Sequence, residues 1–253
     1  MTNSGSANDI IGLGRQYSAG SYLEPHRHDR SQLLYGLTGT VVVTGAAGLW
    51  IMPPDSALWI PAQILHAVTM VGDVSMRSLY LRPHLPLDMP QSCAVLSVSP
   101  LLRALLDEIA GKAAEATRKR ELMEQLVLAE IASRPIVPLS LPLPQAGPLR
   151  DLCLAFSAAP DSTVRLDDWC RTLNMSRRTF TRAFRDAIGL SFVEWRTRAC
   201  VLAAISRLAE GHTITRIAFD LGYDSSASFT AMFRRSTGHP PSRYRHGPDN
   251  PWR

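Results

Sequence analysis

The strongest hydrophobic pattern lies toward the end of the chain, where apolar residues recur three and four positions apart, as on one face of a helix. A short apolar stripe is followed by a tight turn that ends in Ser176, a good helix N-cap. A basic helix is predicted next, over 177–188. Helix, tight turn and basic helix are typical of a helix-turn-helix unit. The two stripes are formed by Leu166, Trp169, Cys170 and Leu173, and by Phe180, Ala183 and Phe184.

The same pattern returns further along the chain, so this region is an internal repeat. Leu173 corresponds to Leu221 at an offset of 48 residues (221 − 173), and Phe184 corresponds to Phe233 at an offset of 49 (233 − 184). The second turn therefore contains one extra residue. One such unit is a weak signal, whereas two in register are specific. The second unit uses Ile214, Ile217, Ala218 and Leu221, and then Phe229, Met232 and Phe233 in a helix predicted over 226–237.

One helix, predicted over about 192–209, connects the two units. Its roughly 18 residues would span about 27 Å. Successive major-groove segments on one face of B-DNA lie ~34 Å apart. Because the helix is shorter than this repeat, we expect the DNA to bend when both units bind, at a cost of the order of a few kcal/mol.

The N-terminal half shows short β-rich runs separated by Gly and Pro. Strands are predicted over 32–37, 40–44, 49–52, 57–60, 66–71 and 75–81, as in a small barrel or jelly roll. Two amphipathic helices are predicted to follow, over 100–111 and 118–133. Five prolines then fall between residues 134 and 148, which favours a stiff extended segment.

These patterns predict an α+β protein with two domains. The first is a β-barrel (jelly roll) with a helical coupling segment, and the second is an all-α double helix-turn-helix domain. We place the barrel at 1–90, the helical coupling or dimerisation segment at 91–134, the Pro-rich linker at 135–148 and the DNA-binding domain at 149–253. An apolar stripe does not show which surface it buries, so the two helices either pack back on the barrel or form a dimer interface.

Positive charge is concentrated in the second domain. Residues 149–253 hold 16 Arg and 10 Asp plus Glu, a net of +6, and residues 1–148 hold 11 basic and 12 acidic residues, a net of −1, which together make +5. Such an excess favours DNA binding through counterion release. No apolar run is long enough for a membrane helix, and no secretory signal is visible. The scattered Cys93, Cys153, Cys170 and Cys200 suit buried thiols in a reducing cytoplasm.

Residues from about 149 to 245 resemble the DNA-binding domain of the AraC/XylS family of bacterial transcription regulators. The likeness rests on the run 217–225, Ile-Ala-Phe-Asp-Leu-Gly-Tyr-Asp-Ser, and on the tail Phe229-x3-Phe233-Arg234-x3-Thr237-Gly238-x-Pro240-Pro241-Ser242-x-Tyr244-Arg245. The resemblance implies double-stranded DNA, an operator or promoter, as the partner. RNA polymerase and a second copy of the chain are further candidate partners, and no membrane is expected.

The resemblance also places the base-facing positions of the first recognition helix at Arg178, Thr181 and Arg182. Arginine can donate two hydrogen bonds to guanine, and threonine offers a hydroxyl or a methyl group. Arg177 and Arg185 are expected to bind phosphates, which orients a protein without reading sequence. The matching positions of the second helix are short and uncharged, so we expect the first unit to provide most of the base discrimination. These positions are Ser226, Ala227, Thr230 and Ala231.

A second resemblance lies in the N-terminal half. The runs Gly20-x5-His26-x-His28-x3-Gln32-x6-Gly39 and Pro61-x4-His66 resemble the two cupin motifs, which bind a metal through three histidines and a glutamate. Gln32 stands at the glutamate position, and Gln63 stands where glycine is usual. The first three ligand positions are separated by even steps, so we expect them to share one face of a strand. If that face points inward, they converge with His66.

Three interpretations of these four residues remain open. Imidazoles with a neutral Gln32 suit a divalent transition metal such as Zn, Ni, Cu or Fe, although the missing carboxylate argues against catalysis. Without metal, the histidines would line the barrel or an interface. The interior would otherwise be an effector pocket, lined by the histidines with Tyr35, Trp50 and Trp59, unless these aromatics are core.

We therefore expect a cytoplasmic, sequence-specific DNA-binding regulator, an activator or a repressor, whose barrel senses a small-molecule or metal effector, and not an enzyme. The effector would change how the barrel docks on the DNA-binding domain or on a second copy. The alternative is a metal-dependent cupin enzyme fused to a DNA-binding domain, which would turn over a substrate. A constitutive architectural DNA binder would show no effector response and little sequence preference.

Overall fold

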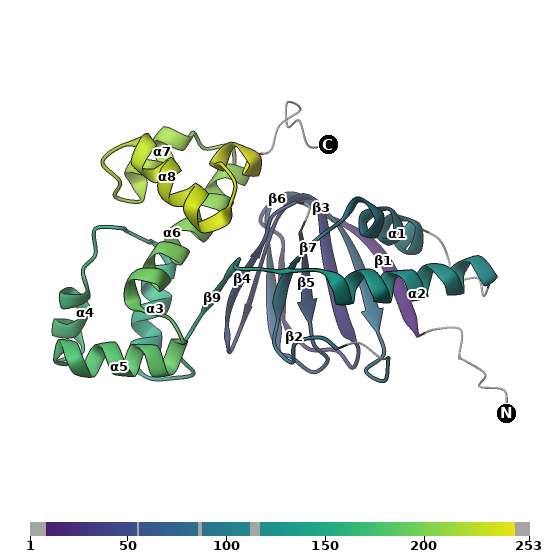
Figure 1. Cartoon of the computed structure of the whole chain (residues 1–253), viewed down its shortest axis with the longest axis horizontal. Coiled ribbons are helices and arrows are strands. Elements are labelled where there is room, and N and C mark those ends of the chain that lie inside the picture. Colours follow the sequence, from purple (N-terminus) through teal and green to yellow (C-terminus); the bar gives the residue numbers. More distant parts are fainter. Residues whose placement is uncertain (1–8, 55, 86–87, 112–116, 246–253) are drawn as a thin grey trace. The chain divides into compact units, whose positions relative to one another are not determined.

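The computed structural model describes residues 9–54, 56–85, 88–111 and 117–245 (Figure 1). The ends of the predicted domains at 1–8 and 246–253 lie outside the described residues. The chain forms two compact units: the first comprises residues 1–43 and 52–138, and the second comprises 44–51 and 139–253. A short segment from the N-terminal half therefore belongs to the C-terminal unit.

The first unit contains an antiparallel sheet, as predicted. Its strand order is β1-β6-β3-β5-β7-β8, and β2 also pairs with β6. The strand β1, which was not predicted, pairs with β6 along its whole length, from Ile10 opposite Leu81 to Tyr17 opposite Val74. The strands are β1 (Ile10–Tyr17), β2 (Tyr22–His26), β3 (Ser31–Gly45), β5 (Ser56–Ile60), β6 (His66–Leu81), β7 (Ala94–Ser97) and β8 (Ile136–Val137).

The turns predicted at Gly39 and Gly72 are wrong, because β3 and β6 run through these positions as long strands. Both glycines have a left-handed backbone, with φ of 72° and 75°. A Cβ at Gly39 would lie 2.5 Å from Cγ2 of Val74 and 2.7 Å from the carbonyl oxygen of Asp73. The glycine thus allows a close approach to another strand within a continuous sheet.

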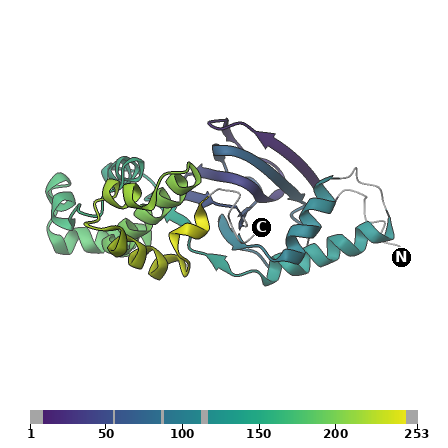
Figure 2. The same ribbon diagram turned by 90° about the horizontal axis from the view of Figure 1, so that it is seen from above.

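The core of the first unit lies between the sheet and the helices α1 (Pro100–Gly111) and α2 (Arg118–Ser133), whose bounds are those predicted. Figures 1 and 2 show both helices along the same side of the sheet. Tyr35 and Trp59 belong to this core, so they are packing residues. The helices contribute Leu102, Leu105, Leu106 and Ile109 from α1, and Val127 and Ile131 from α2.

The second unit combines the helical repeat with a pair of short strands. The helices that were predicted for the repeat, including the connecting helix α6, begin and end as expected. In addition, β4 pairs with β9, with Leu49 opposite Leu141. The elements are β4 (Gly48–Met52), β9 (Ser140–Pro142), α3 (Pro148–Ala158), α4 (Leu166–Thr172), α5 (Arg177–Ile188), α6 (Phe192–Ala209), α7 (Ile214–Asp220), α8 (Ser226–Thr237) and a 3-10 helix, η1 (Pro241–Tyr244).

The segment 44–51 is fastened to the second unit by several hydrogen bonds. Leu143 donates its N–H to the carbonyl of Ala47 at 3.1 Å, and the Arg150 guanidinium donates to the carbonyl of Ala46 at 2.8 Å. Trp50 is buried here. The Pro-rich stretch is therefore partly strand, since β8 pairs with β7 and β9 pairs with β4.

Candidate functional site

The turns of the two helix-turn-helix units begin with the same geometry. The first residue of each turn has a left-handed backbone, with φ of 51° at Asn174 and 76° at Gly222, a conformation that these residue types adopt at low cost. The next residue in each turn donates its N–H to a carbonyl five residues back, at 2.9 Å in both units. The repeat seen in the sequence is thus a structural repeat.

The recognition helices α5 and α8 also begin and end alike. The hydroxyls of Ser176 and Ser225 accept from the backbone N–H three residues later, at 3.2 and 3.1 Å. Gly189 and Gly238 end the helices with φ of 79° and 77°. Both helices have 12 residues, because the capping residues stand at the same spacing in each unit.

An aromatic cluster holds α5 in place. Trp169 of α4 lies 6.3 Å from Phe180 and 6.2 Å from Phe184 of α5, measured between ring centroids. The same indole lies 5.0 Å from Phe192 and 5.7 Å from Trp195 of α6. The inner face of the first recognition helix is thus packed against two other helices.

The outer face of α5 carries the candidate DNA contacts. Arg178, Thr181 and Arg182 are exposed, as is Arg185. In the described part of the chain, neither Arg178 nor Arg182 makes a hydrogen bond or an ion pair. Both guanidiniums are therefore available to a ligand that approaches this face.

Arg177, the other predicted phosphate contact, is engaged within the protein. Its Nε and an Nη atom donate to the two carboxylate oxygens of Asp167 in α4. This hydrogen bonding holds the pKa of Asp167 below its ordinary value. A phosphate would have to compete with Asp167 for this guanidinium.

The candidate positions of α8 are smaller and carry no charge. Ala227 and Ala231 are exposed, whereas Ser226 and Thr230 are half-buried. The packing behind α8 is also aromatic: Phe229 lies 5.7 Å from Phe233 and 5.6 Å from Tyr223. The second recognition helix is thus built like the first, but it presents few hydrogen-bond donors.

The segment before α4 forms hydrogen bonds with the turn of the second unit, a connection that the sequence did not predict. Ser162, which precedes α4, donates its N–H to the carbonyl of Leu221 and its hydroxyl to the carbonyl of Gly222, both at 2.9 Å. A Cβ at Gly222 would lie 2.3 Å from a carboxylate oxygen of Asp161. Glycine is therefore required in the second turn both for its φ and for the close approach of this segment.

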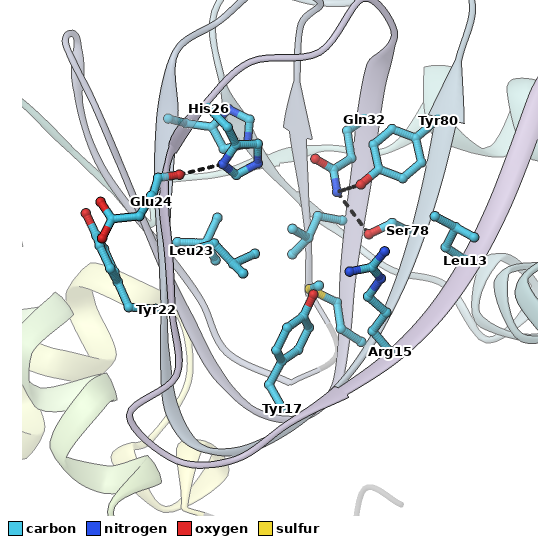
Figure 3. Close-up of a pocket in the computed structure, with 14 residues that line it drawn as sticks. Leu13, Arg15, Tyr17, Tyr22, Leu23, Glu24, His26, Gln32, Ser78 and Tyr80 are labelled. Carbon is cyan, nitrogen blue, oxygen red and sulfur yellow. Dashed lines mark hydrogen bonds between the residues drawn. The ribbon is translucent and has the colours of Figure 1, made fainter.

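The first unit contains a pocket of about 380 Å³ between β1, β2, β3 and β6 (Figure 3). His26, Gln32 and His66 line it, and His28 lies beside them, with its Nε2 3.0 Å from Oε1 of Gln32. The ring of His66 lies 4.4 Å from that of His26 and 5.2 Å from that of His28, between centroids. The structure thus brings the four cupin-like residues together.

The prediction that His26, His28 and Gln32 lie on one face of one strand is wrong. His26 is the last residue of β2, His28 lies in the following loop and Gln32 is on β3. The three side chains therefore do not share one face of one strand. They meet because β2 and β6 are adjacent, with His26 opposite His66.

A backbone carbonyl lies beside Nδ1 of each of the three histidines, that of Arg30 in the case of His28, and this sets the tautomers of His26 and His66. Nδ1 of His26 lies 2.7 Å from the carbonyl oxygen of Glu24, and Nδ1 of His66 lies 2.9 Å from that of Ile64. A carbonyl only accepts, so each Nδ1 carries the proton and each Nε2 keeps a lone pair when the ring is neutral. His66 is 1% exposed, and its Nε2 has no partner in the described part of the chain. Burial lowers its pKa, with smaller contributions from His26 and His28.

The residues do not fit a metal centre of the cupin type. The amide nitrogen of Gln32 donates to Oγ of Ser78 at 2.9 Å and to the hydroxyl of Tyr80 at 3.2 Å, so its neighbours hold this side chain. Among the described residues, no group of three His, Cys, Asp or Glu is placed to hold a metal ion.

Sequence reasoning missed one wall of the pocket. Leu13, Arg15 and Tyr17 line it from β1, at alternating positions that point to one face of a strand. This alternation could have been recognised, but Gly12 and Gly14 weaken the strand signal. The aromatics proposed instead, Tyr35, Trp50 and Trp59, do not line the pocket; each is buried.

Family models match both halves of the chain: an AraC-like ligand binding domain at residues 9–131 and a helix-turn-helix domain at residues 169–247. The HTH-type transcriptional regulator NimR of Escherichia coli (strain K12) is 30% identical over 223 residues, which cover 87% of this chain and 81% of NimR. The HTH-type transcriptional regulator RipA of Corynebacterium glutamicum is 33% identical over 42% of this chain and 32% of its own length.

Among solved structures, ToxT from Vibrio cholerae matches 94% of this chain and 95% of its own chain, with 12% identity and a TM-score of 0.39. No helix in the described ranges is long and apolar enough to cross a membrane. The two family matches and the extended likeness to NimR agree with the double helix-turn-helix and with the sheet domain that precedes it. The chain therefore belongs to the AraC family of transcriptional regulators, with a helix-turn-helix DNA-binding domain and an N-terminal effector-binding domain.

Proposed function

We propose that this regulator reads specific duplex sites mainly through α5, and that a small molecule in the pocket of the first unit changes its occupancy of those sites. The observation that carries the proposal is the outer face of α5, where two guanidiniums that have no partner among the described residues stand one helical turn apart, at Arg178 and Arg182. Thr181 lies between them. These three residues are proposed to face the bases, with Arg177 and Arg185 on phosphates.

The second unit is proposed to position the protein on the DNA more than to discriminate between bases. Ser226, Ala227, Thr230 and Ala231 can contact thymine methyl groups or phosphates, but they bring few strong hydrogen-bond donors to the groove. The connecting helix α6 has 18 residues, about 27 Å of helix against a groove repeat of ~34 Å. Simultaneous docking of α5 and α8 therefore bends the DNA, and the bend adds sequence dependence.

The helix α2 is proposed to pair with a second copy of the chain. Its inner face, with Val127 and Ile131, is buried against the sheet. Its outer face exposes Leu122 and Leu126, at 49% and 42%, one helical turn apart. Packing of α2 on the barrel and pairing of α2 with a second copy are thus compatible, because each would use a different face of the helix.

The proposed functional divisions are the sensor at 1–90, the coupling segment at 91–134, the linker at 135–148 and the DNA reader at 149–253. The proposed setting is the cytoplasm, where DNA and RNA polymerase are reached, and the proposed action is binding without catalysis. His26, His28, Gln32 and His66 are proposed as effector contacts.

Selection of duplexes from a random pool by the full chain, at fixed salt, tests the DNA proposal. We expect an enriched site with two segments about one helical turn apart and stronger base preference in one of them. Repeating the selection with Arg182→Ala should relax that preference, whereas Arg118→Ala, on the exposed start of α2, should leave it unchanged. A pool without any enriched sequence would reject sequence-specific reading.

A further inference from the structure

We propose that the pocket takes a small organic carboxylate that carries a hydroxyl or N–H group at the opposite end of an apolar body. The inference rests on the proposed effector role of the pocket and adds the chemical class of the ligand. It follows from three parts of the lining: an imidazole end and an arginine end, which find no donor and no acceptor among the described residues, and an apolar surface between them (Figure 3).

The imidazole end needs a hydrogen-bond donor. His66 is almost completely buried, and its Nε2 holds a lone pair without a partner among the described residues. Nδ1 of His26 is likewise occupied by a carbonyl, so its Nε2 is also an acceptor. A buried acceptor without a partner costs free energy, and a hydroxyl or N–H of a ligand would satisfy it.

The other end offers a cation. Arg15 and Tyr17 project from β1 toward the interior of the pocket (Figure 3). In the described part of the chain, no hydrogen bond or ion pair engages Arg15. Its charge acts on the partly buried Tyr80, where it opposes the rise that burial causes in the pKa of the phenol. A planar guanidinium pairs well with a carboxylate.

The surface between these ends is aliphatic. Leu23 and Leu34 line it, together with Val68 and Met76. A volume of about 380 Å³ is at the small end of the range for ligand pockets. The ligand is therefore compact, with polar groups at both ends of an apolar body.

Glu24 is the one anion among the described residues of the lining, and a cationic ligand would suit it instead. In Figure 3, however, its carboxylate points away from the histidines, and only its backbone carbonyl meets His26. Glu24 is exposed. The sign of the ligand charge is thus open to a direct test with Arg15 and Glu24 as opposite variants.

The test uses the full chain and four related probes in calorimetric titrations: trans-4-hydroxycyclohexanecarboxylate, cyclohexanecarboxylate, cyclohexanol and trans-4-aminocyclohexanol. We expect the hydroxy acid to bind about tenfold or more tightly than either probe that has one of its two groups, since each of those probes leaves a polar group of the pocket without its hydrogen bond. Zinc sulfate is titrated in parallel.

The variants test which end of the pocket binds which group of the ligand. Arg15→Gln should remove the advantage of the hydroxy acid over cyclohexanol, and the matched Arg118→Gln should keep it. Glu24→Gln should leave the affinity for the hydroxy acid unchanged or raise it. His66→Phe should remove the contribution of the hydroxyl while cyclohexanecarboxylate still binds, which shows that the pocket has kept its fold.

Three results would overturn the proposal: tightest binding of the amino alcohol with loss in Glu24→Gln, stoichiometric zinc binding without binding of the acids, or no binding of any probe. Affinity for a selected duplex is measured on the same samples. Duplex binding without probe binding rejects the ligand class and leaves DNA reading intact. Probe binding that does not change duplex affinity keeps the ligand class and rejects the effector role.

Discussion

The indole Nε1 of Trp195 donates a hydrogen bond to the backbone carbonyl of Pro142 at 2.8 Å. Trp195 is completely buried, and its ring lies 5.8 Å from that of Phe184 on the first recognition helix, between centroids. Pro142 ends β9, which pairs with β4 from the N-terminal half. A side chain in the core of the first helix-turn-helix unit is thus bonded to the strand that holds the segment 44–51.

Trp195→Phe removes this hydrogen bond and part of the packing. We expect the second unit to lose about 1–3 kcal/mol of stability and the chain to bind its duplex more weakly. Trp59→Phe is the matched control, because Nε1 of Trp59 donates to the carbonyl of Pro90 at 3.0 Å in the first unit. Thermal unfolding and duplex titrations at fixed salt measure both effects. An equal loss of duplex affinity in the two variants would contradict the expectation.

Gly48→Ala should weaken the pairing of β4 with β9. A Cβ at this position would lie 2.7 Å from the carbonyl oxygen of Leu141, so the two strands must move apart. We expect a loss of about 1–3 kcal/mol and a lower melting temperature. Gly111→Ala is the control, since no atom lies within 4 Å of its Cβ position. Identical melting curves for the two variants would show that the strand pair adds no stability.

Base discrimination should be unequal in the two parts of the duplex. Arg178→Ala and Arg182→Ala should each cost about 1–3 kcal/mol at particular base pairs, because each guanidinium can donate two hydrogen bonds to a guanine. Ala227→Ser should change little. Titration of duplexes with single base-pair substitutions measures this, and equal discrimination in both segments would overturn the assignment.

Asp167→Asn should release Arg177. The pair with Arg177 lowers the pKa of Asp167, so the carboxylate is charged at neutral pH and competes with phosphate. In the variant we expect tighter binding to all duplexes and a salt dependence steeper by about one unit. Asp151→Asn makes the same charge change on α3 and should have a smaller effect. The same increase in both variants would show that net charge alone is responsible.

The native thiols should react slowly with iodoacetamide. Burial raises the pKa of Cys93, Cys153 and Cys200 to about 12, and it also raises the pKa of Cys170. The thiolate is the reactive form, and its fraction at about pH 8 is therefore very small. Mass spectrometry should find little label on the native chain and label on all four residues in denaturant. Rapid labelling of the native chain would contradict the burial.

Local signals predicted the helical repeat well. Apolar residues recur three and four positions apart in α5 and α8, and the N-caps Ser176 and Ser225 stand immediately before these helices. The strands were predicted less well. Their pattern predicts breaks at Gly39 and Gly72, whereas both glycines lie inside long strands with a positive φ.

The two helix-turn-helix units, the basic charge of their domain and the presence of an antiparallel sheet are all predictable from the amino-acid pattern, because each depends on periodicity and composition over short stretches. The residues that form the pocket wall, and the unit to which the segment 44–51 belongs, depend instead on how the chain folds. Arg15 and His66 line one pocket only because β1 and β2 both pair with β6, and Gly48 lies opposite Pro142 across more than ninety residues of chain. Such pairings depend on which strands become neighbours, and no local pattern encodes that choice.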